Sequence, residues 1–174
     1  MSGTGSSRGN PSMGDIARSV AVLGAIVLTL FALGRFLTVT PDEPVRTVDY
    51  RAAVESSRTV ADFELLAPES LPKGWRATSV RFEPNAWHLG VLTDEEDYVG
   101  LEQVEADTER AVERFAPDSK PFGDTAISGE TWSLHTGPRD DLTYVRREAD
   151  MTIVVTGTAT RVVMERYISS LSAS

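Results

Sequence analysis

Two histidines and a pair of adjacent polar residues are the side chains of this sequence whose types and spacing suit chemistry. His88 and His135 are its only histidines, and it contains no cysteine. Thiol nucleophiles, disulfides and cysteine-bound metals are therefore excluded, and two histidines leave little for a histidine-bound metal cluster. Glu102 and Gln103 follow His88 at a spacing that fits the second strand of a hairpin. A histidine general base oriented by one of them is one hypothesis, although the sequence has no G-x-S-x-G nucleophile motif.

The pairing of the predicted strands 87–93 and 98–105 decides which residue His88 meets. A loop at 94–97, or a tighter one at 95–96, gives a register in which the numbers of paired residues sum to 191. His88 then lies opposite Gln103 on one face of the sheet, and Glu102 lies on the other face. A buried pair of this kind must be mutually hydrogen bonded. We therefore expect His88 and Gln103 to form a structural polar pair.

Other candidates also have a structural interpretation. In the predicted strand 130–136, His135 alternates with Trp132 and Leu134, so it faces solvent if those two fill the core. Tryptophans in strands of a small domain are typical core residues, although they can also form an aromatic ligand platform. The acidic run 94–97 lacks a twelve-residue calcium loop and indicates a solvated hairpin tip. No catalytic, cofactor-binding or metal-binding residue is predicted. The candidate ligand or partner surface comprises Trp87, His88, Gln103, Trp132 and His135.

Strand and helix patterns predict the scaffold that positions these residues. Period-two alternation of β-branched and aromatic residues indicates strands, and spacing of three to four indicates amphipathic helices. Because hairpins predominate, the fold class is α+β, with a largely antiparallel sheet and helices packed on one face. The last predicted helix directs Val163, Met164, Tyr167, Ile168 and Leu171 inward. Strands are expected at 75–83, 87–93, 98–105, 130–136, 142–148 and 151–157, and helices at 48–58, 108–115 and 160–171.

An apolar segment near the start predicts a membrane anchor. Residues 19–34 carry no charge, and apolar character resumes after Arg35 through Val39. A helix over 19–39 is long enough to cross a hydrocarbon layer of ~30 Å, with Arg35 near its end. A cleavable signal peptide and a buried helix are the alternatives. The run is longer than a signal-peptide core, and no small-residue cleavage site follows it.

Domain organisation and charge follow from this anchor. We expect a disordered cytoplasmic tail at 1–18, a transmembrane helix at 19–39, a linker with a short juxtamembrane helix at 40–60, and an extracytoplasmic α+β domain at 61–174. The chain would be a single-pass plasma-membrane protein with its N-terminus cytoplasmic. Its net charge is −9, and residues 1–39 hold three arginines and one aspartate, so the remainder carries −11. Such an acidic domain repels phosphate backbones, which excludes nucleic acid as a partner.

Several motifs resemble an uncharacterised protein family. LPKGW (71–75), WHLGVLT (87–93), YVGLEQ (98–103), the strand around Trp132, and IVVTGTAT (153–160) before a last helix occur in this order. In this combination the sequence resembles single-pass actinobacterial envelope proteins that contain a domain of unknown function. The resemblance implies the topology and location given above. It implies no reaction, cofactor or catalytic residue.

Two functional hypotheses remain, with a third behind them. The first is a non-catalytic, membrane-anchored domain that binds an envelope protein, a peptide or a lipid-like ligand, or assists an assembly. The second is a small extracytoplasmic hydrolase centred on His88, and the third is a structural spacer. The absence of a nucleophile motif favours the first hypothesis, and no cofactor is expected.

Overall fold

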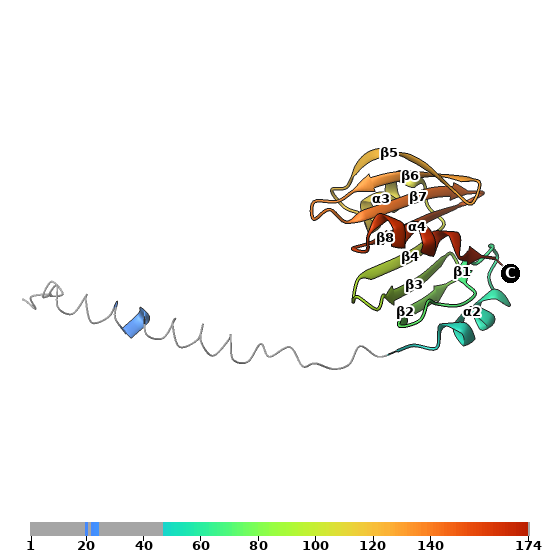
Figure 1. Ribbon diagram of the computed structural model, residues 1–174, viewed down its shortest axis with the longest axis horizontal. Helices are drawn as coiled ribbons and strands as arrows, with labels where there is room; N and C mark the ends of the chain where they lie inside the picture. The colour runs from blue at the N-terminus through green and yellow to red at the C-terminus, as the bar shows by residue number, and fades with distance from the viewer. Residues whose placement is uncertain (1–19, 21, 25–46, 174) are drawn as a thin grey trace, which may run out of the picture. The chain divides into compact units, whose positions relative to one another are not determined.

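A seven-stranded antiparallel sheet organises the compact part of the chain. The computed structural model describes residues 20, 22–24 and 47–173. It separates two units, Met1–Pro44 and Val45–Ser174. In the second unit, the sheet order is β2-β3-β4-β8-β7-β6-β5, seen in Figure 1 from bottom to top, and β1 pairs with β9. The elements are α2 (Tyr50–Arg58), β1 (Ala67–Pro68), β2 (Arg76–Glu83), β3 (Ala86–Leu92), β4 (Tyr98–Val104), α3 (Thr108–Phe115), β5 (Lys120–Ile127), β6 (Glu130–Thr136), β7 (Leu142–Glu148), β8 (Met151–Gly157), α4 (Arg161–Ser169) and β9 (Leu171–Ser172).

The antiparallel sheet confirms the main part of the expected α+β fold. The strands expected from the sequence occur as β2, β3, β4, β6, β7 and β8. The prediction omitted β5, which contains Pro121, Gly123 and Asp124, residue types that are rare in strands. The strand tolerates them because it lies at the edge of the sheet and its register shifts between Pro121 and Gly123.

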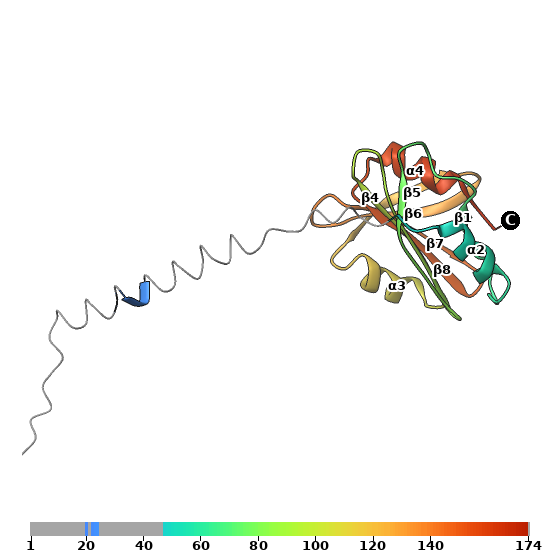
Figure 2. The same cartoon turned by 90° about the horizontal axis from the view of Figure 1, so that it is seen from below.

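Helices cover both faces of the sheet, so the prediction that they pack on one face is wrong. Figure 2 shows α3 on one side and α2 and α4 on the other. The face below α4, called here the α4 face, carries the larger hydrophobic cluster, which includes Trp87, Leu101 and Met164. The opposite, α3 face carries a smaller cluster around Val154 and Ala111. A second helix is needed there because apolar side chains of β4, β7 and β8 would otherwise face solvent.

Helix α2, which the sequence placed in a linker, packs against the domain. Tyr50 and Val54 are only 7% and 6% exposed and belong to the larger cluster. The Tyr50 hydroxyl donates to the carbonyl oxygen of Pro68 at 3.2 Å. Arg58 donates to the carbonyl oxygen of Ser172 at 2.9 Å. The compact unit therefore includes α2, and a fragment starting at residue 60 would lack part of the core.

The last helix is shorter than expected. It ends at Ser169, and Leu171 pairs with Pro68 in the two-stranded sheet. Met164, Tyr167 and Ile168 are buried as predicted, but Leu171 is only half-buried and lies outside the helix. The chain leaves the helix at this point because residues 171–172 form backbone hydrogen bonds with β1 instead of continuing the helical turn.

The hairpin of β3 and β4 has a different register from the expected one. Trp87 lies opposite Gln103 and His88 opposite Glu102, so the predicted His88–Gln103 pair is wrong. Both loops considered from the sequence have an even number of residues. The actual loop is 94–96, closed by a 2.9 Å bond from the Thr93 amide to the Asp97 carbonyl oxygen, with Glu96 at φ 65°. Three-residue loops ending in a left-handed residue are common in hairpins, and a change of one residue exchanges every pair.

Tyr167 provides a test of the packing below α4. Its side chain is 2% exposed and stacks on Trp75 with centroids 6.2 Å apart, while its hydroxyl has no hydrogen-bond partner among the described residues. Because an unpaired buried hydroxyl is costly, Tyr167→Phe should raise the free energy of unfolding by about 1 kcal/mol. The matched control is Tyr50→Phe, which should lower it by about 1 kcal/mol because that hydroxyl is paired. Urea unfolding measures both, and a loss of stability in Tyr167→Phe would contradict the prediction.

The expected membrane segment lies almost entirely outside the described residues. Val20 and residues 22–24 are described and helical. Among the residues that the structure describes, no helix has both the length and the apolar character required to cross a membrane.

Candidate functional site

A β-bulge in β2 turns Ser79 onto the α3 face. Ala77 lies opposite Val91 and is buried on the α4 face, where regular alternation would also place Ser79. The register shifts between these two residues, and Ser79 pairs with Gly90 instead. Thr78 is therefore the extra residue of the bulge. Bulges commonly re-aim a side chain next to a functional site.

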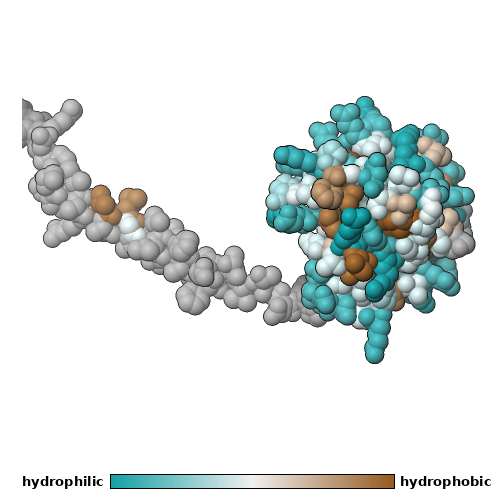
Figure 3. Space-filling model, turned by 45° about the horizontal axis from the view of Figure 1, so that its top comes forward, coloured by the Kyte–Doolittle hydropathy of each residue, from teal (hydrophilic) through white to brown (hydrophobic). Residues whose placement is uncertain are grey.

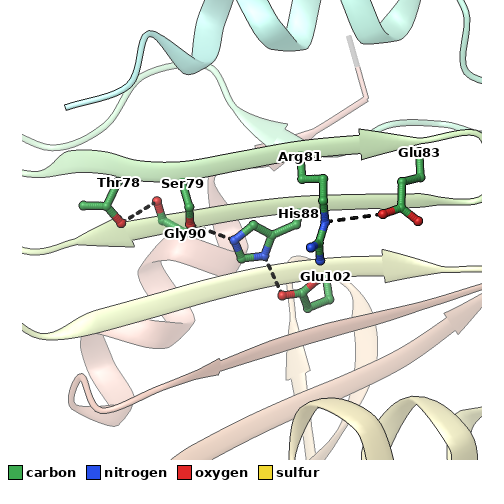
Figure 4. A network of polar contacts seen from close by, with 7 residues as sticks. All are labelled: Thr78, Ser79, Arg81, Glu83, His88, Gly90 and Glu102. Atoms are coloured by element: carbon green, nitrogen blue, oxygen red, sulfur yellow. Dashed lines mark hydrogen bonds and ion pairs between the residues drawn. The ribbon is translucent and has the colours of Figure 1, made fainter. Parts of the chain in front are cut away.

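Ser79, His88 and Glu102 form a hydrogen-bonded array on three adjacent strands (Figure 4). Ser79 Oγ lies 2.7 Å from His88 Nε2, and His88 Nδ1 lies 2.5 Å from Glu102 Oε1. The side chains of His88 and Glu102 are 16% and 11% exposed. In the tautomer whose Nδ1 donates to the Glu102 carboxylate, Nε2 accepts from the Ser79 hydroxyl. The order hydroxyl, imidazole, carboxylate is that of a nucleophile, its base and the group that orients the base.

The ring of Tyr98 lies over two glycines beside this array. A Cβ atom on Gly100 would lie 2.8 Å from the Tyr98 hydroxyl, and one on Gly90 would lie 3.0 Å from it. A Cβ atom on Gly90 would also collide with Ser79 Oγ, so the two hydroxyls occupy the space that glycine leaves at this position. Burial, and to a smaller extent the charge of Glu102, raise the pKa of Tyr98. The phenol therefore stays protonated at neutral pH and can donate a hydrogen bond.

Little space remains beside the array. The cavity next to His88 and Glu102 has a volume of about 10 Å³ and is also lined by Arg81 and Phe115. This is close to the room that one water molecule needs. Arg81 lies opposite His88, and its side chain is 60% exposed with its Nε 3.6 Å from Glu83. Only a small group could therefore reach the array.

Three residues of the predicted surface lie on the α4 face, away from His88. Trp87 and Trp132 are 1% and 3% exposed and are part of the core. Gln103 is 2% exposed, and its amide accepts from the Leu66 amide at 2.7 Å and donates to the Glu64 carbonyl oxygen at 2.9 Å. The predicted surface thus divides between the two faces of the sheet. Gln103 instead holds the segment that leads into β1.

His135 lies on the α3 face, opposite in direction to Trp132 and Leu134 as predicted. It is half-buried, however, and does not face solvent freely. Its Nε2 lies 3.4 Å from Ser133 Oγ, while its buried Nδ1 has no partner among the described residues. Burial lowers the pKa of His135. This second serine–histidine pair therefore lacks the carboxylate that orients His88.

A cavity of about 720 Å³ adjoins Gln103 at the end of the sheet. The segment before β1, the β2–β3 turn, the end of β4 and the β7–β8 turn surround it. Phe63, Met151 and Ile153 supply apolar lining, and no lysine, arginine or histidine lines it. We call it the carboxylate pocket, after Asp62, Glu64, Glu105, Glu148 and Asp150 in its lining.

The acidic loop 94–96 is an exposed hairpin tip, as the sequence predicts. Its Glu96 forms an ion pair with Arg76 at 2.5 Å, and this hydrogen bond lowers the pKa of Glu96. Within the described part of the chain, no group of three or more histidine and acidic side chains is arranged to hold a metal ion.

Comparison with known proteins identifies the family. A family model described as a protein of unknown function (DUF4245) matches residues 8–171. The chain belongs to the DUF4245 family. Its match covers the expected anchor, the array and the carboxylate pocket. No match was found among curated proteins or among solved structures.

Membership in DUF4245 confirms the expected family of unknown function, whereas an actinobacterial origin stays a prediction. In this DUF4245 chain, the sequence pointed to His88 but missed Ser79 and Tyr98. Ser79 carries no sequence signal, because the bulge that turns it toward His88 contains no glycine. Gly90 and Gly100 lie opposite each other in β3 and β4, and each is next to buried apolar residues. Two paired glycines in strand interiors were the sequence signal that another group, here the Tyr98 ring, lies close to the backbone.

Proposed function

We propose that this chain is a membrane-anchored, extracytoplasmic domain that binds a partner non-catalytically in the carboxylate pocket. The observation that supports this proposal is the pocket itself. Its volume of about 720 Å³ falls in the range of about 300–1,000 Å³ that is typical of ligand sites. It also combines apolar surface with polar groups held by the sheet, as binding sites commonly do.

The charge of the pocket favours a cationic partner. Glu148 is paired with Arg146 at 2.6 Å, but no ion pair within the described residues involves Asp62, Glu64, Glu105 or Asp150. These carboxylates attract a positive group and repel an anionic lipid headgroup. The proposed partner is therefore a lysine- or arginine-containing segment of an envelope protein, with apolar side chains that contact Phe63 and Met151.

The membrane anchor is the second part of the proposal. The uncharged run in 19–39 supports it, as do the exposed apolar side chains of Val20, Val22 and Leu23, with exposed fractions of 67%, 59% and 66%. In the compact unit, the large apolar side chains that are exposed are Val60, Phe122 and Val162. The side of it seen in Figure 3 is largely hydrophilic, with hydrophobic residues in small separate patches. We place the N-terminus in the cytoplasm and the carboxylate pocket outside, in a single-pass plasma-membrane protein.

Site-specific photo-crosslinking in native membranes tests both parts. A photoreactive residue at Asn85, an exposed position in the pocket lining, should crosslink to a partner, and the product should stay in the pellet after a carbonate wash. The matched control is the same residue at Arg110, which is exposed on α3, where no such product is expected. Release by carbonate would contradict the anchor. Identical products from both positions, or none from Asn85, would contradict the pocket.

A further inference from the structure

We propose that the Ser79–His88–Glu102 array is a nucleophilic site that cleaves carboxylic esters with a small acyl group. This activity goes beyond the binding proposed above and is spatially separate from it. Gln103 and Ile153, which line the carboxylate pocket, face the α4 side of the sheet. The array lies on the α3 face.

The array meets the geometric requirements for an activated serine. The hydroxyl and the ring nitrogen are 2.7 Å apart, within the reach needed for proton transfer. The second ring nitrogen is held by a carboxylate at 2.5 Å, which sets the tautomer and leaves the lone pair of His88 Nε2 directed at Ser79. All three side chains stand on adjacent strands of the sheet, so little reorganisation is needed for reaction.

The second serine–histidine pair on the same face lacks this arrangement. Ser133 Oγ and His135 Nε2 are 3.4 Å apart, and no described group holds Nδ1 of that ring. Its serine is therefore not activated. The contrast between the two pairs gives the proposal an internal control in the same protein.

The Tyr98 hydroxyl is suited to stabilise the developing negative charge of the reaction. It and Ser79 Oγ, where the new bond forms, lie on the same side of Gly90, whose missing side chain leaves them room. The carbonyl oxygen on the carbon that Ser79 attacks could accept from Tyr98 as it becomes an oxyanion. Tyr98 would thus act on the reacting atoms, while Glu102 is a positioning residue that acts through His88.

The available space defines the substrate class. The free space beside His88 and Glu102 is about 10 Å³, so only the smallest acyl groups, such as acetyl, could reach Ser79 from this side, and the exposed Arg81 side chain would have to move to admit them. Tyr98 and Phe115 also line a larger cavity of about 440 Å³ on the α3 face, bordered by Pro117 and Pro138. Its lining also includes the Arg139–Asp141 ion pair, and we assign this cavity to the alcohol part of the ester.

The reaction consumes the ester and one water molecule and releases an alcohol and a carboxylic acid. Ser79 Oγ bonds to the carbonyl carbon, its proton passes to His88 Nε2, and the carbonyl oxygen becomes the oxyanion. The carbon–oxygen bond to the alcohol then breaks, and the alcohol leaves with the proton from His88. Water repeats the sequence on the acyl-serine, which releases the carboxylic acid and restores Ser79.

A fluorophosphonate probe on the purified full chain tests this proposal, because such probes react with activated serines. Mass spectrometry of the wild-type protein should locate the label at Ser79 and not at Ser133. His88→Gln should slow labelling by at least about 100-fold, the scale of general-base catalysis. Glu102→Gln should lower the rate at saturating probe at least about tenfold without changing the probe concentration for half-saturation. Ser133→Ala should label like the wild type.

The label is mapped in the wild-type protein, so the test gives a result even if a variant misfolds. A label at Ser79 that exceeds every other serine supports the proposal. No label at Ser79, equal labelling of Ser79 and Ser133, or unchanged labelling in folded His88→Gln overturns it. The proposed binding is unaffected by either result, because crosslinking from Asn85 reports on a different face.

Discussion

Replacement of Gly157 by alanine is expected to destabilise the compact unit by more than about 3 kcal/mol. A Cβ atom at this position would collide with the carbonyl oxygen of Tyr98 and lie 3.1 Å from the Cα atom of Val99. Both are backbone atoms of β4, the strand that pairs with β8 in the middle of the sheet. A side chain could rotate away from such a collision, but a paired strand can move only if its hydrogen bonds are distorted. Urea unfolding followed by circular dichroism measures the loss.

Gly137→Ala is the matched control for this substitution. The nearest atom to a Cβ there is the Cβ of Asp141 at 3.5 Å, which is an ordinary contact. The control should therefore change the free energy of unfolding by no more than about 0.5 kcal/mol. Equal losses in the two variants would show that the close approach of β4 and β8 at Gly157 does not determine the effect.

Gln103→Ala is expected to lower the free energy of unfolding by about 2–4 kcal/mol. The substitution removes the acceptor of the Leu66 amide and the donor to the Glu64 carbonyl oxygen, both made by a side chain that is 2% exposed. A buried amide is then left unpaired, and a cavity opens beside it. The segment 64–66 also forms a wall of the carboxylate pocket, so the same change should weaken partner binding.

Gln103→Met separates the hydrogen bonds from the volume. It fills most of the space but restores neither bond, so it should still cost about 1–3 kcal/mol and increase hydrogen exchange at the Leu66 amide. Combination with His88→Ala should give additive losses within about 0.5 kcal/mol, because the two side chains lie on opposite faces and share no partner. A large coupling would contradict the placement of the two side chains on opposite faces.

The sequence predicted most strands because each shows clear alternation, but it did not predict how two of them pair. Register depends on a loop, and the acidic loop contains neither glycine nor asparagine to indicate its left-handed residue, Glu96. The alternation of apolar residues in the two strands nevertheless indicates the length of the loop. Trp87, Leu89 and Val91 can face the same side as Val99 and Leu101 only if the loop has an odd number of residues.

The candidate site was less predictable than the fold. His88 was identified as a rare residue type, whereas its two partners depend on the loop register and on the bulge at Thr78. Each of these features shifts a strand by one residue, and each therefore decides which face a side chain takes. Without them, Glu102 and Ser79 would both face away from His88. A site assembled across three strands is determined by such local irregularities, which residue patterns alone do not reveal.

The attachment of α2 has a mechanical consequence. A pulling force applied to the chain before α2 meets the 2.9 Å bond from the Val48 amide to the Ala77 carbonyl oxygen and then this helix, which is tied to the domain by Tyr50, Val54 and the Arg58 contact with Ser172. The adjoining β1–β9 ladder is only two residues long, whereas the large sheet has seven strands. Under tension, α2 would therefore detach while the sheet stays intact, which lengthens the extended chain before the sheet and leaves both faces of the sheet in their native register.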